Sequence, residues 1–345
     1  MCNIAGYAGN KPAAPALLEI IRRQQYYDGN MSAGIVTYHE GKLYRRCISG
    51  SVEDLMEKTD ALQLPGTVGI AHTRPGHHAV QPVISEDETT ALATNGTTKL
   101  TEHCARWDAA AKLLLENGFP YSSVSYREDR KNPHPQLPDG GTVSTMEVRY
   151  GIFDYWVAQG KSPEEAMAHS AEAMYKDNAS VILTTRFPDR FFAIRTTRGL
   201  YAATKNGETF LATARLGLPE EVRGQGFCLP LFYACSVSAN GVQISPYRME
   251  IEEVSDMTPY TYREAYRRFE ELLKPGKEPM YFDELEFAAD DMRDIWPGDH
   301  TFVQNARLVY DMLEQFEREG RLQKELREQD RDGFPRLRWY FSLKD

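Results

Sequence analysis

The sequence predicts an α+β protein with a smaller module at its carboxyl end. Three observations support this prediction. Segments typical of strands occur before residue 95 and again between 180 and 251, a pair of helical segments lies between them, and the character of the chain changes after 255. Strands, then helices, then strands again are typical of two sheets that sandwich or flank helices.

The composition favours a soluble class. Of the 345 residues, 41% are hydrophobic and 11% are aromatic, which suffices for a sizeable core. No window approaches the roughly 18 consecutive apolar residues of a membrane span, and the amino end lacks a basic region followed by an apolar run. We therefore expect a cytoplasmic protein with no membrane partner.

Charge and cysteine content argue against two further classes. The net charge of −10 disfavours nucleic acid as a partner, because phosphate-binding surfaces need clustered Lys and Arg. The five cysteines are scattered, with no C-x-x-C pair, so neither a disulfide framework nor a metal site is predicted. We also expect no cofactor.

The first part of the chain is predicted to alternate strands and helices. Ile4 to Ala8 is a short apolar run, and residues 15–23 carry apolar side chains at helical spacing. The other predicted elements here are a hairpin over 33–38 and 43–47, a helix over 52–62, and strands over 68–73 and 90–94.

The middle of the chain combines helices, a long loop and more strands. Residues 119–142 are rich in Pro, Ser and Asp, which predicts a surface loop. Ser162-Pro163 followed by Glu165 is typical of a helix start. Helices are predicted over 104–117, over 146–159 and from 163 on, and strands over 180–185, 191–195, 199–203, 209–213 and 241–251.

Residues 255–345 are predicted to form a small, mainly helical module. Helices are expected over 262–273, 282–292 and 301–319, the last with an apolar face at the i, i+3, i+4 spacing. A turn and a basic, aromatic strand over 332–340 follow. This pattern is compatible with a winged-helix-like module, and a helical bundle packed on the first domain explains it nearly as well.

Cys2 is the first candidate for chemistry. If Met1 is removed, Cys2 carries both a thiol and a free α-amine, with ordinary pKa values of about 8.5 and about 7.7 to 8.0. The amine can then take the proton of the thiol, directly or through a water molecule. Taken alone, a Cys at this position is more often an accident, so the rest of the chain must decide.

Four motifs, of which this start is the first, follow one another in a fixed order. They are Met-Cys-x-Ile-x-Gly-Tyr at residues 1–7, Arg22-Arg23 ahead of Ser32-Ala33-Gly34-Ile35, Gly69-Ile70-Ala71-His72-Thr73-Arg74 at the end of one strand, and Thr94-Asn95-Gly96 at the end of the next. Together they resemble the class II glutamine amidotransferases, whose glutaminase domains, such as that of glucosamine-6-phosphate synthase, are N-terminal-nucleophile hydrolases. The resemblance covers roughly residues 1–250. It implies a four-layer αββα sandwich for residues 1–254, with 255–345 as a separate module.

The resemblance also implies a set of site residues. Cys2 matches the nucleophile that attacks the side-chain amide of glutamine and forms a thioester, releasing ammonia and then glutamate. Asn95, through its side-chain amide, and Gly96, through its backbone N–H, match the oxyanion hole. Arg74 matches the residue that binds the α-carboxylate of glutamine, where a guanidinium can donate two parallel hydrogen bonds.

These residues also have plainer interpretations. Arg74 could form an ion pair at the end of a strand, and Asn95-Gly96 could be an ordinary turn. His72 lies inside a strand and is better explained as structural. His77 is a weaker candidate for the pocket, because His77-His78 fits a surface loop.

The sequence departs from the family pattern at three places. Asn3 stands where the family usually has Gly, and Pro75-Gly76 follows Arg74 where an aromatic residue is common. Thr145 stands where the family has the Asp that neutralises the α-amine of glutamine. The sequence therefore does not predict which group, if any, would bind the α-amine of the substrate in place of that Asp.

The leading hypothesis is a glutamine amidotransferase that acts as a glutaminase. Gly160-Lys161-Ser162 lacks the earlier Gly of a phosphate-binding loop, and residues 255–345 resemble no known acceptor domain. A partner synthase subunit would then use the ammonia, unless the module serves to form a homo-oligomer. Two alternatives remain: an N-terminal-cysteine amidase for another small amide, and a catalytically lapsed binding or regulatory protein.

Overall fold

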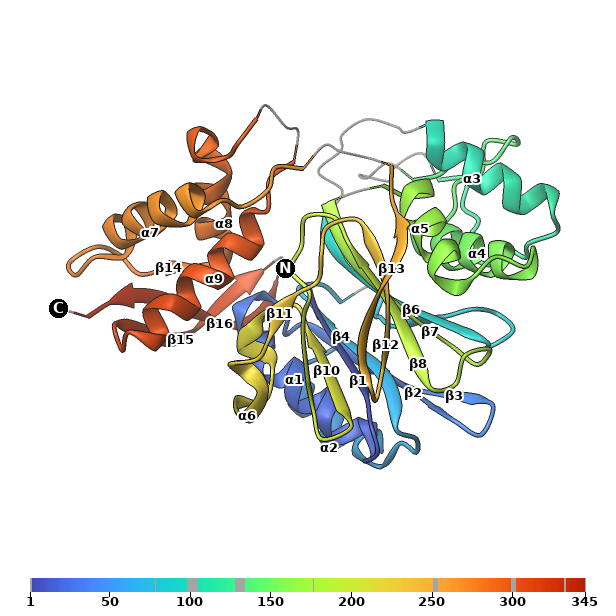
Figure 1. The fold of residues 1–345 in the computed structure, drawn as a ribbon, viewed down its shortest axis with the longest axis horizontal. Coiled ribbons are helices and arrows are strands. Elements are labelled where there is room, and N and C mark those ends of the chain that lie inside the picture. Colours follow the sequence, from blue (N-terminus) through green and yellow to red (C-terminus); the bar gives the residue numbers. More distant parts are fainter. Residues whose placement is uncertain are drawn as a thin grey trace.

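Two antiparallel sheets pack face to face, and helices cover their outer faces (Figure 1). The computed structural model describes residues 2–77, 79–97, 105–127, 134–175, 177–250, 254–298, 302–331 and 333–344. The prediction of an α+β protein with two sheets is thereby confirmed. Contrary to what the succession of elements suggests, the sheets do not enclose the helices; the helices lie outside the pair of sheets, in the αββα order that the family resemblance implies.

The first sheet holds the amino end of the chain at its centre. Within the described residues its seven strands run in the order β11-β9-β10-β1-β4-β2-β3. Strand β1 pairs with β4 on one side, with Ile4 opposite His72, and with β10 on the other. The strands are β1 (Asn3–Ala8), β2 (Ser32–His39), β3 (Lys42–Ile48), β4 (Val68–Arg74), β9 (Tyr201–Lys205), β10 (Glu208–Ala212) and β11 (Phe227–Cys228).

The second sheet contains the strand that carries Asn95 and Gly96. Six described strands run in the order β13-β12-β8-β7-β6-β5. They are β5 (Val83–Ile84), β6 (Thr90–Thr97), β7 (Asp177–Thr184), β8 (Arg190–Arg195), β12 (Tyr233–Ser238) and β13 (Gly241–Arg248). Asn95 and Gly96 pair with Ala179 and Asn178 inside the β6–β7 ladder. The alternative that Asn95-Gly96 is an ordinary turn is therefore wrong.

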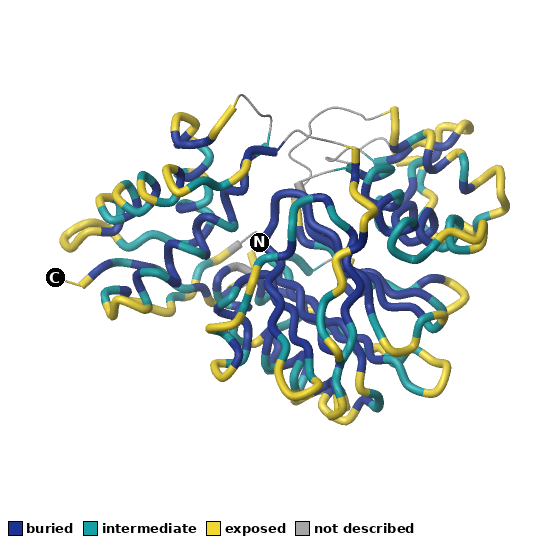
Figure 2. Tube along the Cα trace, viewed as in Figure 1, coloured by how far each residue is buried: buried dark blue, intermediate teal, exposed yellow. Residues whose placement is uncertain are grey.

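The sheets meet in an apolar layer to which β1 contributes Ile4 and Ala8, and β6 contributes Ala91 and Ala93. A Cβ on Gly6 would lie 2.4 Å from the ring of Phe191 across this layer, so the close approach of the sheets requires glycine there. Burial of this central layer is visible in Figure 2.

Helices α1 (Ala13–Asp28) and α2 (Val52–Lys58) cover the first sheet, and α4 (Thr145–Ala158) and α5 (Pro163–Ala173) cover the second. Helix α3 (Ala105–Glu116) packs on α4 through a separate cluster. The order of layers is thus helix, sheet, sheet, helix. No helix in the described part of the chain is long and apolar enough to cross a membrane.

Local sequence signals explain where α4 and α5 begin. The Ser162 hydroxyl accepts a hydrogen bond from the Glu165 N–H at 3.1 Å, and the Ser144 hydroxyl accepts one from the Met146 N–H at 3.2 Å. Helix α4 therefore begins at Thr145, next to the pocket described below. The predicted helix over 52–62 is shorter than expected, because α2 ends at Lys58 and a separate 3₁₀ turn follows over Ala61–Gln63.

The carboxyl module contains a sheet in addition to the predicted helices. Its elements are α7 (Pro259–Leu273), β14 (Met280–Tyr281), α8 (Phe282–Asp291), α9 (Asn305–Arg318), β15 (Leu322–Arg331) and β16 (Phe334–Leu343). The strand order is β14-β16-β15. Strand β16 agrees with the predicted carboxyl-terminal strand, whereas β15 is not predicted.

The module packs on the first domain through α8 and α9. Arg198 of the domain forms an ion pair with Glu286 of α8 at 2.6 Å, and Arg215 pairs with Glu314 of α9 at 3.3 Å. The Tyr310 hydroxyl of α9 donates a hydrogen bond to Asn3 Oδ1 at 3.0 Å. The module thus contacts the residue that follows Cys2.

Candidate active site

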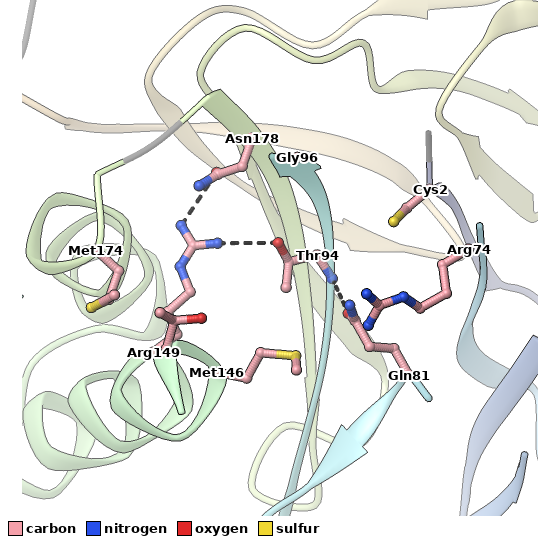
Figure 3. A pocket seen from close by; sticks show the side chains of 10 residues that line it. Cys2, Arg74, Gln81, Thr94, Gly96, Met146, Arg149, Met174 and Asn178 are labelled. Atoms are coloured by element: carbon pink, nitrogen blue, oxygen red, sulfur yellow. Dashed lines mark hydrogen bonds between the residues drawn. The ribbon is translucent and has the colours of Figure 1, made fainter. Parts of the chain in front are cut away.

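One pocket lies where the ends of β1, β4 and β6 approach the first turn of α4 (Figure 3). Its volume is about 160 Å³. The lining residues are Cys2, Arg74, Gln81, Thr94, Gly96, Thr145, Met146, Arg149, Met174 and Asn178. Four residues singled out from the sequence, Cys2, Arg74, Gly96 and Thr145, therefore come together although they are far apart in the chain.

Cys2 immediately precedes β1 and is partly exposed. Side chains alternate along a strand, so Cys2 belongs to the same face as Ile4, the face toward the second sheet. Figure 3 shows its thiol directed into the pocket, near the guanidinium of Arg74.

Asn3 points to the opposite face and is completely buried. Its Nδ2 donates to the Gln24 carbonyl and to Thr73 Oγ1, each at 3.2 Å, and its Oδ1 accepts from Tyr310. The departure from the usual Gly thus has a structural explanation. The residue that follows Cys2 is thus held to α1, β4 and the carboxyl module.

Arg74 ends β4 and contributes its guanidinium to the pocket wall. Its Nη1 donates to the Ala79 carbonyl at 2.9 Å, which fixes the loop that follows. Its Nε is buried without a hydrogen-bond partner among the described residues, and none of their carboxylates forms an ion pair with it. The interpretation of Arg74 as a strand-end ion pair therefore finds no partner in the described chain.

Thr94 is held from two sides by groups of other strands and loops. Gln81 Oε1 accepts a hydrogen bond from the Thr94 N–H at 2.7 Å, and His72 Nε2 lies 3.0 Å from the Thr94 carbonyl oxygen. The carbonyl can only accept, so Nε2 carries the proton. These bonds connect the Arg74 loop and β4 to the part of β6 that precedes Asn95.

Asn95 lies one residue beyond this anchored position and is completely buried. It shares the β6 face of Ala91 and Ala93, which is directed toward the first sheet, and it does not line the pocket. Neither its Nδ2 nor its Oδ1 has a hydrogen-bond partner among the described residues. Gly96, in contrast, is exposed and lines the pocket.

His72 is a buried, neutral histidine. Burial is the main cause that lowers its pKa from 6.5 to about 3, and the nearby positive charge of Arg74 acts in the same direction. The native state thus keeps the ring neutral where the unfolded chain protonates it. This supports the structural interpretation of His72.

The lowered pKa of His72 predicts a pH-dependent stability. The contribution is complete above pH 6.5 and is lost as the pH falls toward 3, because only the unfolded chain binds the proton in that range. Between pH 6.5 and 5 the free energy of unfolding should fall by about 2 kcal/mol through this residue. Urea unfolding of wild type and His72→Gln across these pH values measures the difference. Parallel curves for wild type and His72→Gln would contradict the prediction.

Thr145 begins α4 and lines the pocket at the place where the family resemblance expects a carboxylate. The acidic residue in the same turn, Glu147, does not replace it. Its two oxygens accept hydrogen bonds from the backbone N–H groups and hydroxyls of Ser122 and Ser123, and it does not line the pocket.

Arg149 is a pocket residue that the sequence analysis did not identify. It lies one helical turn after Thr145, with only 4% of its surface exposed. Nη2 donates to Asn178 Oδ1 at 3.2 Å, and Nη1 donates to the hydroxyls of Ser180 and, at 3.5 Å, Thr94. The helical period places it beside Thr145, but only the fold brings it next to β7.

His77 lies outside the pocket wall. Its ring centroid is 4.1 Å from that of Phe334, at the start of β16, and its carbonyl accepts a hydrogen bond from Ser49 at 3.0 Å. The structure therefore places it between the Arg74 loop and the carboxyl module. His78 lies outside the described residues.

No protein-family model matches the chain. The chain is similar to glutamine–fructose-6-phosphate aminotransferases, being 28% identical over 215 residues to that of Pyrococcus horikoshii and 29% identical over 220 residues to that of Gloeobacter violaceus. Each alignment covers 62% of this chain and 32% of the relative. A shorter one, to the protein of Rhizobium leguminosarum bv. viciae, is 42% identical over 78 residues, 23% of this chain and 13% of the relative. The chain thus spans about a third of the length of these relatives.

Solved structures show the same fold at lower identity. Glutamine phosphoribosylpyrophosphate amidotransferase from B. subtilis matches with a TM-score of 0.54 and 18% identity, over 76% of this chain and 52% of its own. An allosteric regulatory enzyme of purine biosynthesis matches with a TM-score of 0.55 and 15% identity, over 81% and 59%. The predicted resemblance to the class II glutamine amidotransferases is confirmed by these relatives in sequence and in fold.

Proposed function

We propose that this chain, which resembles the class II glutamine amidotransferases in sequence and in fold, is an amide hydrolase with Cys2 as its nucleophile. The observation that carries the proposal is the single pocket lined by Cys2, Arg74 and Gly96. In its leading form the substrate is glutamine and the products are glutamate and ammonia.

The first step requires Cys2 to be the first residue of the mature chain. Its α-amine then takes the thiol proton while the sulfur attacks the carbonyl carbon of the amide, and the protonated amine later gives that proton to the departing ammonia. A water molecule cleaves the resulting thioester, which releases the acid and restores the thiol. One amide and one water thus give one carboxylic acid and one ammonia.

Asn95 and Gly96 are proposed to stabilise the oxyanion of the tetrahedral intermediate. Asn95 is supported by its complete burial and its unpaired Nδ2, since a buried donor without a partner is rare and suits an oxygen that appears only during the reaction. Gly96 is supported by its place in the pocket wall. Each donor in comparable sites contributes about 3 kcal/mol to transition-state binding.

Arg74 is proposed to bind the carboxylate of the substrate. A guanidinium can donate two parallel hydrogen bonds to a carboxylate, which orients as well as binds it. The support is its position beside Cys2 and the lack of an ion-pair partner among the described residues. The Ala79 carbonyl fixes one end of the guanidinium and leaves other N–H groups for the ligand.

The carboxyl module is proposed to be winged-helix-like and to dock a partner synthase subunit or a second copy of the chain. The order α7, β14, α8, α9, β15, β16, with β16 between the other two strands, supports this assignment. The Tyr310–Asn3 hydrogen bond offers a physical connection between a docked partner and the nucleophile.

A second candidate, an amidase for an amide other than glutamine, is favoured by Thr145 in the pocket wall. Loss of a carboxylate opposite a substrate ammonium costs on the order of 2 to 5 kcal/mol in a desolvated site. This candidate keeps the same nucleophile and oxyanion hole. It changes only which group the substrate carries, opposite Thr145, in place of the α-amine of glutamine.

The test is ammonia release by the purified full chain from glutamine and a panel of small carboxamides. We expect turnover of at least one amide, and loss of turnover after alkylation of the thiols. Protection by that amide against alkylation of Cys2, followed by peptide mass spectrometry, assigns the reaction to this pocket. A panel without any ammonia release would contradict the proposal and favour a binding or regulatory protein.

A further inference from the structure

The pocket contains a second guanidinium besides that of Arg74. Arg149 follows Thr145 by four residues on α4, so the two side chains lie on one helical face. Figure 3 shows Arg149 and Arg74 on opposite sides of Thr94, both at the pocket. The far end of a ligand whose amide lies at Cys2 is therefore within the field of two positive charges.

Arg149 is buried, and no carboxylate of the described residues forms an ion pair with it. All the hydrogen-bond acceptors that it reaches, on Asn178, Ser180 and Thr94, are neutral, and no carboxylate occurs among the described residues that line the pocket. Burial lowers its pKa to about 10, which leaves it positively charged near neutral pH. A buried charge without a counter-charge is costly, so an anionic ligand would be bound strongly here.

Asn178 adds a second, independent sign of a missing ligand. It is 2% exposed and lines the pocket, and its Oδ1 is occupied by Arg149. Its Nδ2 has no hydrogen-bond partner among the described residues. The side of the pocket opposite Arg74 thus presents a cation and an unused donor, which is the arrangement that an acceptor anion satisfies.

A free ammonium fits this side poorly. An ammonium carries hydrogen-bond donors and no acceptor, so it cannot pair with the donors of Arg149 and Asn178. Its positive charge would also be repelled by that of Arg149. Thr145 supplies no negative charge, and Glu147 is occupied by Ser122 and Ser123. The ammonium of glutamine would therefore be repelled by Arg149 on this side of the pocket.

We propose that the pocket selects a carboxamide whose far end carries two carboxylates and no ammonium, one carboxylate held by Arg74 and the other by Arg149. The inference rests on the proposed amide hydrolysis at Cys2 and favours its second form, an amide other than glutamine, over the glutamine form. Hydrolysis then converts the dianionic amide and one water into a tricarboxylate and an ammonium ion.

Three amides that differ at one position test this proposal. L-glutamine carries an ammonium on its α-carbon, glutaramic acid carries hydrogen there, and 2-carboxyglutaramic acid carries a carboxylate. We expect kcat/KM for ammonia release by the full chain to rise in that order, with at least about a tenfold advantage of the dianion over glutamine. A wild-type preference for glutamine would overturn the proposal and leave the amide hydrolase intact.

Arg149→Met should remove the preference for the dianion, because it keeps an unbranched side chain and removes the charge. The matched control is Arg106→Met, which removes an exposed guanidinium from α3 outside the pocket and should keep the wild-type order. An unchanged substrate order in a folded Arg149→Met protein would contradict the role of Arg149.

Thr145→Asp provides a variant that does not remove a buried group. The new carboxylate at position 145 stands four residues before Arg149, the spacing of a helical ion pair, and it favours the positive end of the helix dipole. We expect KM for glutamine to fall and KM for the dianion to rise. Movement of both values in the same direction would contradict the electrostatic explanation.

Binding to Cys2→Ala separates this inference from the proposed function. Calorimetry with the three amides reports recognition without turnover. If the dianion binds most tightly while the active chain hydrolyses no amide of the panel, the proposed function fails and the preference for a dianionic ligand stands. If all three bind equally, the substrate class fails whatever the chain hydrolyses.

Discussion

Replacing Cys2 with alanine is expected to abolish amide hydrolysis, with a loss in kcat on the order of 10⁴-fold or more. Cys2 is the one thiol among the described residues that line the pocket. Met146 and Met174 also line it, but a thioether cannot replace a thiol as the nucleophile. Alanine is also small enough for removal of Met1, so the variant still begins with a free α-amine. The measurement is ammonia release from the best amide of the panel.

The control for this prediction is Cys228→Ala. Cys228 is another partly exposed free cysteine of the described chain, and it lies in β11, outside the pocket. Its replacement should leave kcat/KM within a few-fold of wild type. Equal activity of Cys2→Ala and wild type would show that the nucleophile lies elsewhere.

Replacing Asn95 with alanine is expected to lower kcat by about 10² to 10³-fold. The free energy of unfolding should stay within about 1 kcal/mol of wild type, because the side chain makes no hydrogen bond to described residues that could be lost. A buried asparagine with a structural role would give the opposite combination, a large loss of stability with little change in kcat.

Kinetics together with urea unfolding measure both quantities for Asn95→Ala. The matched control is Asn117→Ala, at the exposed end of α3, which should change neither. Unchanged kcat in Asn95→Ala would remove this residue from the oxyanion hole and leave Gly96 as the proposed donor.

Much of the fold could be predicted from local patterns. The capping signals at Ser162 and the glycine that ends α3 specify their boundaries through backbone geometry, which neighbouring residues determine. The strands β1, β2, β4 and β8 follow from short apolar runs. These elements depend little on what packs against them.

Strand β15 could not be predicted in the same way. Residues 322–331 are mostly charged and long, a composition that favours helix as much as strand. They form a strand because ten successive residues pair with β16, which contributes Phe341 and Leu343 to the core of the module. Tertiary pairing thus overrides a weak local preference.

The residues of the candidate site also fall into two groups, those that local motifs predict and one that only tertiary packing brings to the pocket. Cys2, Arg74 and Gly96 were identified because they belong to short motifs at strand ends, where the chain reaches a common edge. Arg149 was missed because it appears in sequence as one more residue of a helix. Its importance arises from Asn178 and Ser180, which only the packing of α4 on β7 brings to it.

The most direct test of the central claim is the intact mass of the protein isolated from cells. The proposed chemistry requires Cys2 to carry a free α-amine, so the mass should be that of the chain without Met1. Brief incubation with the preferred amide, followed by acid quenching, should add the mass of the acyl group to the chain without Met1. Chains that retain Met1 should show no such addition. Retention of Met1 in active protein would contradict the account, because the α-amine of Cys2 would then be locked in a peptide bond.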